Sequence, residues 1–214
     1  AGLDTIAFDP AVFPPGDPAA ISLLTAPPVL ADPAGTIVDG AGAGVSIRSS
    51  PASMMSFDGL VFASGSGAPL AKVRVANVSV TEFDGTAIVV CGGAYPTCDG
   101  DVVKPIVENV VAIANEAAGL RIEGRDVSKA RIANVVARQN GQAGVRVQAT
   151  RTLGGTRIEG YTAVANGGAG ILLGSNGNTV SNNVFGSDYR ITTGNLGNHD
   201  GIYINNKASN IIQS

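Results

Sequence analysis

The chain has 214 residues, of which 44% are hydrophobic and 14% charged, and its formal net charge is −3. Such a chain is too apolar to be disordered, and the absence of lysine or arginine runs gives little support to nucleic acid or an anionic membrane as a partner. No apolar stretch approaches the roughly 18–20 residues that span a bilayer. No signal peptide opens the sequence, so we expect a mature chain or a fragment without a membrane span.

Residues 1–35 are predicted to form an N-terminal capping segment. Apolar stretches at residues 6–8 and 21–24 favour two short strands, and the pairs Pro14-Pro15 and Pro27-Pro28 interrupt them. A cap is expected because an uncovered first coil of a repeat protein exposes strand edges and core.

From residue 36 to residue 214 a repeat dominates the sequence. A glycine followed by alternating apolar residues recurs at intervals of 26, 34, 25, 26 and 31 residues. The glycines are Gly59, Gly85, Gly119, Gly144, Gly170 and Gly201. A second series, an apolar residue followed two positions later by asparagine, includes Val75-Ala-Asn77, Val107-Glu-Asn109 and Ile132-Ala-Asn134. A third marker keeps the same phase, since Asn115, Asn140 and Asn166 each stand four residues before a repeat glycine.

This repeat predicts an all-β fold, a single-stranded right-handed parallel β-helix with an N-terminal cap. A coil of about 25 residues is too short for two packed helices, and the alternation of apolar residues is that of strands. Coils stacked about 4.8 Å apart bury their inward rows together. We expect the glycines to serve corners where φ is positive, and the asparagines to form side-chain amide ladders.

The phrases NGQAGVRV, NGGAGILL, GNTVSNN and HDGIYI resemble the parallel β-helix repeats of pectate-lyase-like proteins and of bacterial surface proteins. The resemblance covers nearly the whole chain. It implies the fold, and it implies no single activity, because β-helices include lyases, hydrolases, epimerases, adhesins and passive stalks.

Two insertions lengthen the coils, near residues 91–101 and 187–199. The first contains Cys91 and Cys98, which are close enough in sequence to form a disulfide and thereby indicate an extracellular or cell-surface protein. Two free thiols are the alternative. The same insertion contains Asp99 and Asp101, which are weak candidates for calcium, the one cofactor considered, because an Asp-Gly-Asp turn is common.

The outer faces of the predicted strands show few clustered carboxylates. One outward row contains Val89, Arg121, Arg146, Leu172 and Tyr203, and the row beside it has Glu123 as its only acid. On a second face, Glu108 and Glu159 are two coils apart and thus roughly 10 Å from each other. We interpret these as solvated charges.

The best catalytic or binding candidates are residues of the second insertion and outward-facing residues expected beside it. His199, Asp200, Tyr203 and Arg146 are weak candidates for proton transfer, and Tyr189, Arg190, Tyr203, Arg121 and Arg146 are weak candidates for sugar binding. The non-functional alternative is that Asp200 caps the turn before Gly201 and that His199 is an ordinary loop residue.

The sequence therefore favours a non-catalytic extracellular structural or adhesive solenoid, which self-associates end to end through its terminal coils into filaments. The alternatives are a polysaccharide-active enzyme (lyase, hydrolase or epimerase) and a carbohydrate-binding module without turnover. An enzyme would act on a polysaccharide partner, and we expect no cofactor, with calcium as the one alternative.

Overall fold

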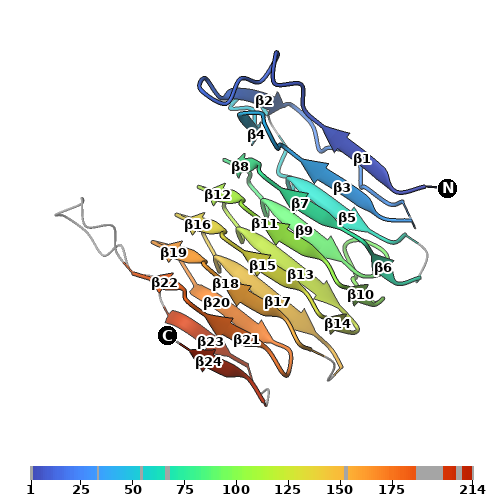
Figure 1. Ribbon diagram of the computed structural model, residues 1–214, viewed down its shortest axis with the longest axis vertical. Coiled ribbons are helices and arrows are strands. Elements are labelled where there is room, and N and C mark those ends of the chain that lie inside the picture. Colours follow the sequence, from blue (N-terminus) through green and yellow to red (C-terminus); the bar gives the residue numbers. More distant parts are fainter. Residues whose placement is uncertain are drawn as a thin grey trace.

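The computed structural model describes residues 2–32, 34–53, 55–65, 68–151, 154–186, 200–205 and 209–213. Over these residues the chain forms parallel strands that stack along the longest axis of the molecule (Figure 1). Strand β1 lies at one end of the stack, and β23 and β24 lie at the other. The predicted all-β parallel solenoid is confirmed. The described residues include no helix that is long and apolar enough to cross a membrane.

Within the described residues, four sheets run along the axis, and their strand pairs are parallel. Sheet A contains β1 (Asp4–Ala7), β3 (Thr36–Asp39), β7 (Arg74–Ala76), β11 (Ile106–Glu108), β15 (Arg131–Ala133), β18 (Arg157–Glu159), β21 (Thr179–Ser181) and β24 (Ile211–Gln213). Sheet B contains β2 (Ala19–Leu23), β4 (Val45–Ser49), β8 (Ser79–Thr81), β12 (Val111–Ile113), β16 (Val136–Arg138), β19 (Thr162–Val164) and β22 (Val184–Phe185). Sheet C contains β5 (Leu60–Ala63), β9 (Ile88–Cys91), β13 (Leu120–Gly124), β17 (Val145–Ala149), β20 (Ala169–Gly174) and β23 (Asp200–Ile204). The short sheet D contains β6 (Leu70–Ala71), β10 (Val102–Val103) and β14 (Val127–Ser128).

One coil visits the sheets in a fixed order. The chain passes from β9 in sheet C through β10 in sheet D, β11 in sheet A and β12 in sheet B, and then returns to sheet C as β13. Each strand pairs in register with the equivalent strand of the next coil, so equivalent residues form straight rows. The inward row of sheet A shows this well, with Val38, Val75, Val107, Ile132, Ile158 and Val180 all at most 1% exposed.

The repeat glycines have a different role from the one that the sequence suggested. Gly119, Gly144 and Gly170 are not among the residues with positive φ, so that expectation is wrong for them. Glycine is required at these positions because the backbones of successive coils approach each other closely where sheet C begins. A Cβ atom at Gly119 would lie 2.7 Å from the carbonyl oxygen of Gly144, and one at Gly170 would lie 2.7 Å from that of Gly201.

Positive φ occurs instead at the corners between sheets D and A, A and B, and B and C, mostly at residues that carry a side chain. The corner between sheets A and B has Asn77, Asn109 and Asn134, with φ of 57°, 53° and 51°. The corner between sheets D and A has lysine in three successive coils. A left-handed conformation costs an L-residue roughly 1–2 kcal/mol, and asparagine tolerates it better than lysine does.

The predicted asparagine ladders are present at two places. At the exposed corner, Asn134 donates to Asn109 (3.2 Å) and Asn109 donates to Asn77 (3.0 Å). Inside the solenoid, the buried Asn115 donates to Asn140 (2.8 Å). Asn140 in turn donates to Asn166 (2.9 Å). The buried ladder links the coils at the passage from sheet B to sheet C.

The first 32 residues contain two strands that continue the main sheets. Strand β1 pairs in register with β3, and β2 pairs with β4. Exposed apolar side chains occur here, with Leu3 at 43% and Ile6 at 39%. Whether this segment acts as a separate cap remains a prediction.

Candidate functional site

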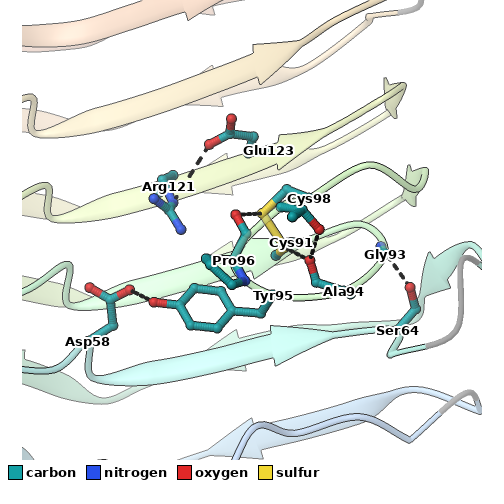
Figure 2. The surroundings of a disulfide bond; sticks show 11 residues. Asp58, Ser64, Cys91, Gly93, Ala94, Tyr95, Pro96, Cys98, Arg121 and Glu123 are labelled. Atoms are coloured by element: carbon teal, nitrogen blue, oxygen red, sulfur yellow. Dashed lines mark hydrogen bonds and ion pairs between the residues drawn. A yellow bond between two sulfur atoms is a disulfide. The ribbon is translucent and has the colours of Figure 1, made fainter.

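The insertion between β9 and β10 folds back on the outer face of sheet C. Cys91 and Cys98 form the predicted disulfide, with Cα atoms 4.9 Å apart. The amide of Cys98 donates to the carbonyl of Ala94 (2.9 Å), and the amide of Gly93 donates to the hydroxyl of Ser64 on the preceding coil (2.8 Å). Figure 2 shows the contact from Gly93 to Ser64, which joins the loop to the preceding coil. The loop is thus an ordered part of the solenoid surface.

Tyr95 is the side chain that this loop places on sheet C. Its ring packs against a small buried cluster separate from the main core, made of Val61, Ala63, Val89 and the two cysteines. The Tyr95 hydroxyl donates to Oδ2 of Asp58 at 2.5 Å (Figure 2). Burial, followed by the hydrogen bond to this carboxylate and its charge, raises the pKa of Tyr95 to about 12. Tyr95 therefore stays neutral at physiological pH.

Arg121 and Arg146 lie side by side beyond Tyr95, on the adjacent strands β13 and β17. The guanidinium carbon of Arg121 is 5.9 Å from the centre of the Tyr95 ring, within cation–π range. Nε of Arg121 lies 3.8 Å from a Glu123 oxygen, and Nε of Arg146 donates to Gln148 at 2.9 Å. We call these residues, Tyr95, Arg121, Glu123, Arg146 and Gln148, the sheet C face.

The sequence-predicted residues come together only in part. The predicted outward row is observed, since Arg146 pairs with Leu172 and Leu172 pairs with Tyr203. Leu172 separates Tyr203 from Arg146, so the two are about 9.6 Å apart, twice the strand spacing. Tyr203 is 47% exposed, and Asp200 is the first residue of β23. Tyr189, Arg190 and His199 lie outside the described residues.

A scan against family models matches residues 35–185 to the right-handed β-helix region, well over half of the chain. The chain belongs to the right-handed β-helix family. Searches of curated proteins and of solved structures gave no match. Membership of this family establishes the handedness of the β-helix and assigns it no function.

In the first insertion of the β-helix, the acidic residue Asp101 is paired with an arginine. Arg125 binds the Asp101 carboxylate through two hydrogen bonds, of 2.9 and 2.8 Å. These bonds hold the pKa of Asp101 below its usual value. Within the described ranges, no group of three or more His, Cys, Asp or Glu side chains converges as a metal site would require. Calcium binding at Asp99 and Asp101 remains a prediction.

Sheet A carries an ion-pair ladder on its outer face. Arg74 lies between two acids of neighbouring coils, and Arg131 bridges Glu108 (2.5 Å) and Glu159 (3.6 Å). The ladder consists of Asp39, Arg74, Glu108, Arg131, Glu159 and Arg157. The hydrogen bond from Arg131, followed by that from Arg74, lowers the pKa of Glu108. The two glutamates that the sequence placed two coils apart are therefore bridged by one arginine.

Sequence reasoning missed these arginine partners and the role of Tyr95. The signal for the arginines was present, because Arg74, Arg131 and Arg157 occupy the first outward position of their sheet A strands, two residues before the acidic row. The contact of Tyr95 with Asp58 joins residues 37 positions apart, and no spacing in the sequence indicates it.

Proposed function

We propose that this β-helix is a non-catalytic extracellular structural or adhesive element. The observation that supports this proposal best is the pairing of its surface carboxylates. Glu108 and Glu159 on sheet A and Asp101 in the first insertion all bind arginines. The disulfide between Cys91 and Cys98 supports an oxidising, extracytoplasmic setting.

The ion pairs count against acid–base catalysis by these groups. A carboxyl that acts as a general acid near neutral pH needs a raised pKa. Arginine neighbours lower the pKa of Asp101 and Glu108, so both remain ionised well below neutrality. An ionised carboxylate that already accepts two hydrogen bonds from arginine serves to hold adjacent coils together.

Adhesion needs a contact surface, and we propose the sheet C face for it. Neighbouring guanidinium groups of Arg121 and Arg146 are suited to carboxylates or hydroxyls of a sugar, and the amide of Gln148 adds a further polar group. Tyr95 is an aromatic side chain at the border of this face. The face thus supports carbohydrate binding without turnover as a second candidate function.

The enzyme alternative depends on the second insertion. If His199, Asp200, Tyr203 and Arg146 perform acid–base chemistry on a polysaccharide, an alanine at any of His199, Tyr203 or Arg146 abolishes turnover. Unchanged cleavage in all three variants would remove this assignment. If the wild-type protein is folded by circular dichroism and cleaves no acidic or neutral polysaccharide, this result agrees with the non-catalytic proposal.

End-to-end self-association belongs to the same proposal, because strands that pair in parallel register present the same edge pattern at each coil. Electron microscopy of the 214-residue chain, with a mass measurement in solution, tests it. Regular fibres support a structural role through self-association. Monomers under all conditions refute self-association and leave binding through the sheet C face, which a glycan array with an Arg121→Gln/Arg146→Gln control then tests.

A further inference from the structure

An apolar hollow of about 480 Å³ lies at the corner between sheets D and A, where β6 and β10 turn into β7 and β11. Its volume is within the range of about 300–1,000 Å³ that is usual for small-molecule sites. No acidic or aromatic residue contributes to its described lining. We call it the corner hollow, and the lining residues that matter below are Leu3, Ile37, Val103, Ile106, Lys72 and Lys104.

The aliphatic surface of the corner hollow is short along the solenoid axis. Ile106 points outward from sheet A, and its equivalent in the next coil is Arg131. Val103 points outward from sheet D, and its equivalent in the next coil is Ser128. Neither Arg131 nor Ser128 belongs to the described lining. The apolar surface therefore ends with the coil of β10 and β11, so the hollow suits a small molecule better than a polymer.

Two positive charges adjoin this aliphatic surface. Lys72 and Lys104 are exposed, with φ of 55° and 51°, a left-handed conformation that is unfavourable for lysine. The corner itself does not require lysine, because glycine has the equivalent place in two other coils, at Gly35 and Gly155. In the part of the chain that the structure describes, the ion pairs are made by arginines and none by these two lysines. The corner hollow therefore offers two cations that no described carboxylate neutralises.

We propose that the corner hollow binds a fatty acid, with the alkyl chain on the aliphatic lining and the carboxylate beside Lys72 or Lys104. Removal of methylene groups from water supplies affinity, and a carboxylate forms charge-assisted hydrogen bonds with an ammonium group. A sugar would place its hydroxyl groups against aliphatic side chains that cannot bond to them.

An extended peptide is a poorer occupant, because it binds by adding a strand to a free sheet edge. Strand β7 has no free edge, since it pairs with β3 on one side and with β11 on the other. The proposal goes beyond the proposed function and uses no residue of the sheet C face.

Isothermal titration calorimetry of the 214-residue chain tests this proposal with octanoate, decanoate and dodecanoate, each below its micelle concentration. The affinity should rise by about twofold to fourfold for each added methylene, because the hollow is open and covers the alkyl chain only in part. Decanol, which has the same alkyl chain as decanoate and no charge, separates the contribution of the chain from that of the carboxylate.

Charge variants test the role of the lysines. Lys72→Gln/Lys104→Gln should weaken binding of decanoate by about fivefold, the upper range for an exposed ion pair, and leave binding of decanol unchanged. Lys129→Gln is the matched control, because Lys129 has the same corner conformation, with φ of 53°, and does not belong to the described lining. It should bind decanoate as the wild type does.

Apolar variants test the lining. Val103→Ser/Ile106→Thr introduces residues that the protein itself has at equivalent positions, Ser128 in the next coil and Thr179 in a later one. We therefore expect the variant to fold, which circular dichroism checks. It should bind decanoate and decanol more weakly than the wild type does, and its affinity should depend less on chain length.

Several results would overturn the proposal. They are an absence of binding to all three acids, an affinity that does not rise with chain length, and wild-type affinity in a folded Val103→Ser/Ile106→Thr variant. Binding to phosphatidylglycerol vesicles without binding to the monomeric acids would assign the corner to a lipid surface and refute a fatty-acid site. Loss of decanoate binding in Arg121→Gln/Arg146→Gln, with binding retained in the double lysine variant, would place the ligand on the sheet C face instead.

Discussion

The buried asparagine ladder gives the sharpest test of how this β-helix is held together. Asn140 is 1% exposed, and its amide donates to Asn166 (2.9 Å) and to the carbonyl of Ala112 (3.2 Å). Its oxygen accepts from the side chain of Asn115 at 2.8 Å and from the Asn115 backbone at 3.3 Å. Substituting Asn140→Ala removes all four bonds at once.

The magnitude follows from the groups that stay buried. The backbone amide and the side-chain amide of Asn115 both lose the Asn140 oxygen in a buried part of the solenoid. Each buried polar group left without a partner costs about 1–3 kcal/mol, so Asn140→Ala should lower the free energy of unfolding by about 3 kcal/mol. In the exposed ladder, Asn134→Gly keeps the left-handed corner, as Gly160 does in the next coil, with φ of 60°. It should lower stability by less than about 1 kcal/mol, since solvent replaces the lost bond.

Guanidinium unfolding followed by far-ultraviolet circular dichroism measures both variants. The expected result is a clearly lower midpoint for Asn140→Ala than for Asn134→Gly. If the two midpoints agree, buried hydrogen bonds do not contribute more than exposed ones in this solenoid, and the reasoning fails.

Three further predictions concern the surface. Because the pKa of Tyr95 is raised, its neutral hydroxyl contributes stability that is complete below about pH 10 and is lost as pH rises towards 12. Tyr95→Phe should therefore lose less melting temperature than the wild type does at alkaline pH. An equal loss of melting temperature in both proteins would contradict the contact with Asp58. Because the pKa of Glu108 is lowered, its carboxylate contributes stability above the ordinary pKa of 4.5, and this stability disappears as pH falls through the lower pKa of the folded protein. Arg131→Gln should therefore lower the melting temperature at pH 7 and have little effect at pH 2. An equal loss of melting temperature at both pH values would refute the ion pair. Cys98→Ser should lower the free energy of unfolding by about 2–3 kcal/mol. It should also increase binding of a hydrophobic dye, because the loop that carries Tyr95 loosens and uncovers the small apolar cluster around Val61 and Val89. Unchanged dye binding would show that this cluster stays covered without the disulfide.

The residues that the sequence predicted well are those whose role depends on the repeat itself. Val107, Ile132 and Ile158 belong to one inward row because stacking in register places equivalent positions one above another. The same logic predicted the amide ladders and the adjacent positions of Arg121 and Arg146. A periodic fold converts spacing along the chain into neighbourhood in space, so these contacts could be obtained from spacing alone.

The remaining features required the tertiary structure, since they depend on how close the chain comes to itself at each corner. Gly119 resembles a turn glycine in the sequence, yet it is required by a carbonyl oxygen of the next coil, whereas Asn109 and Lys104 adopt positive φ. The insertion gave no indication that Tyr95 would cover Val61 and Val89, because a loop outside the repeat follows no periodic rule. Sequence periodicity determined the stack of coils, and side-chain packing between coils decided where charge, aromatic rings and apolar hollows meet on its surface.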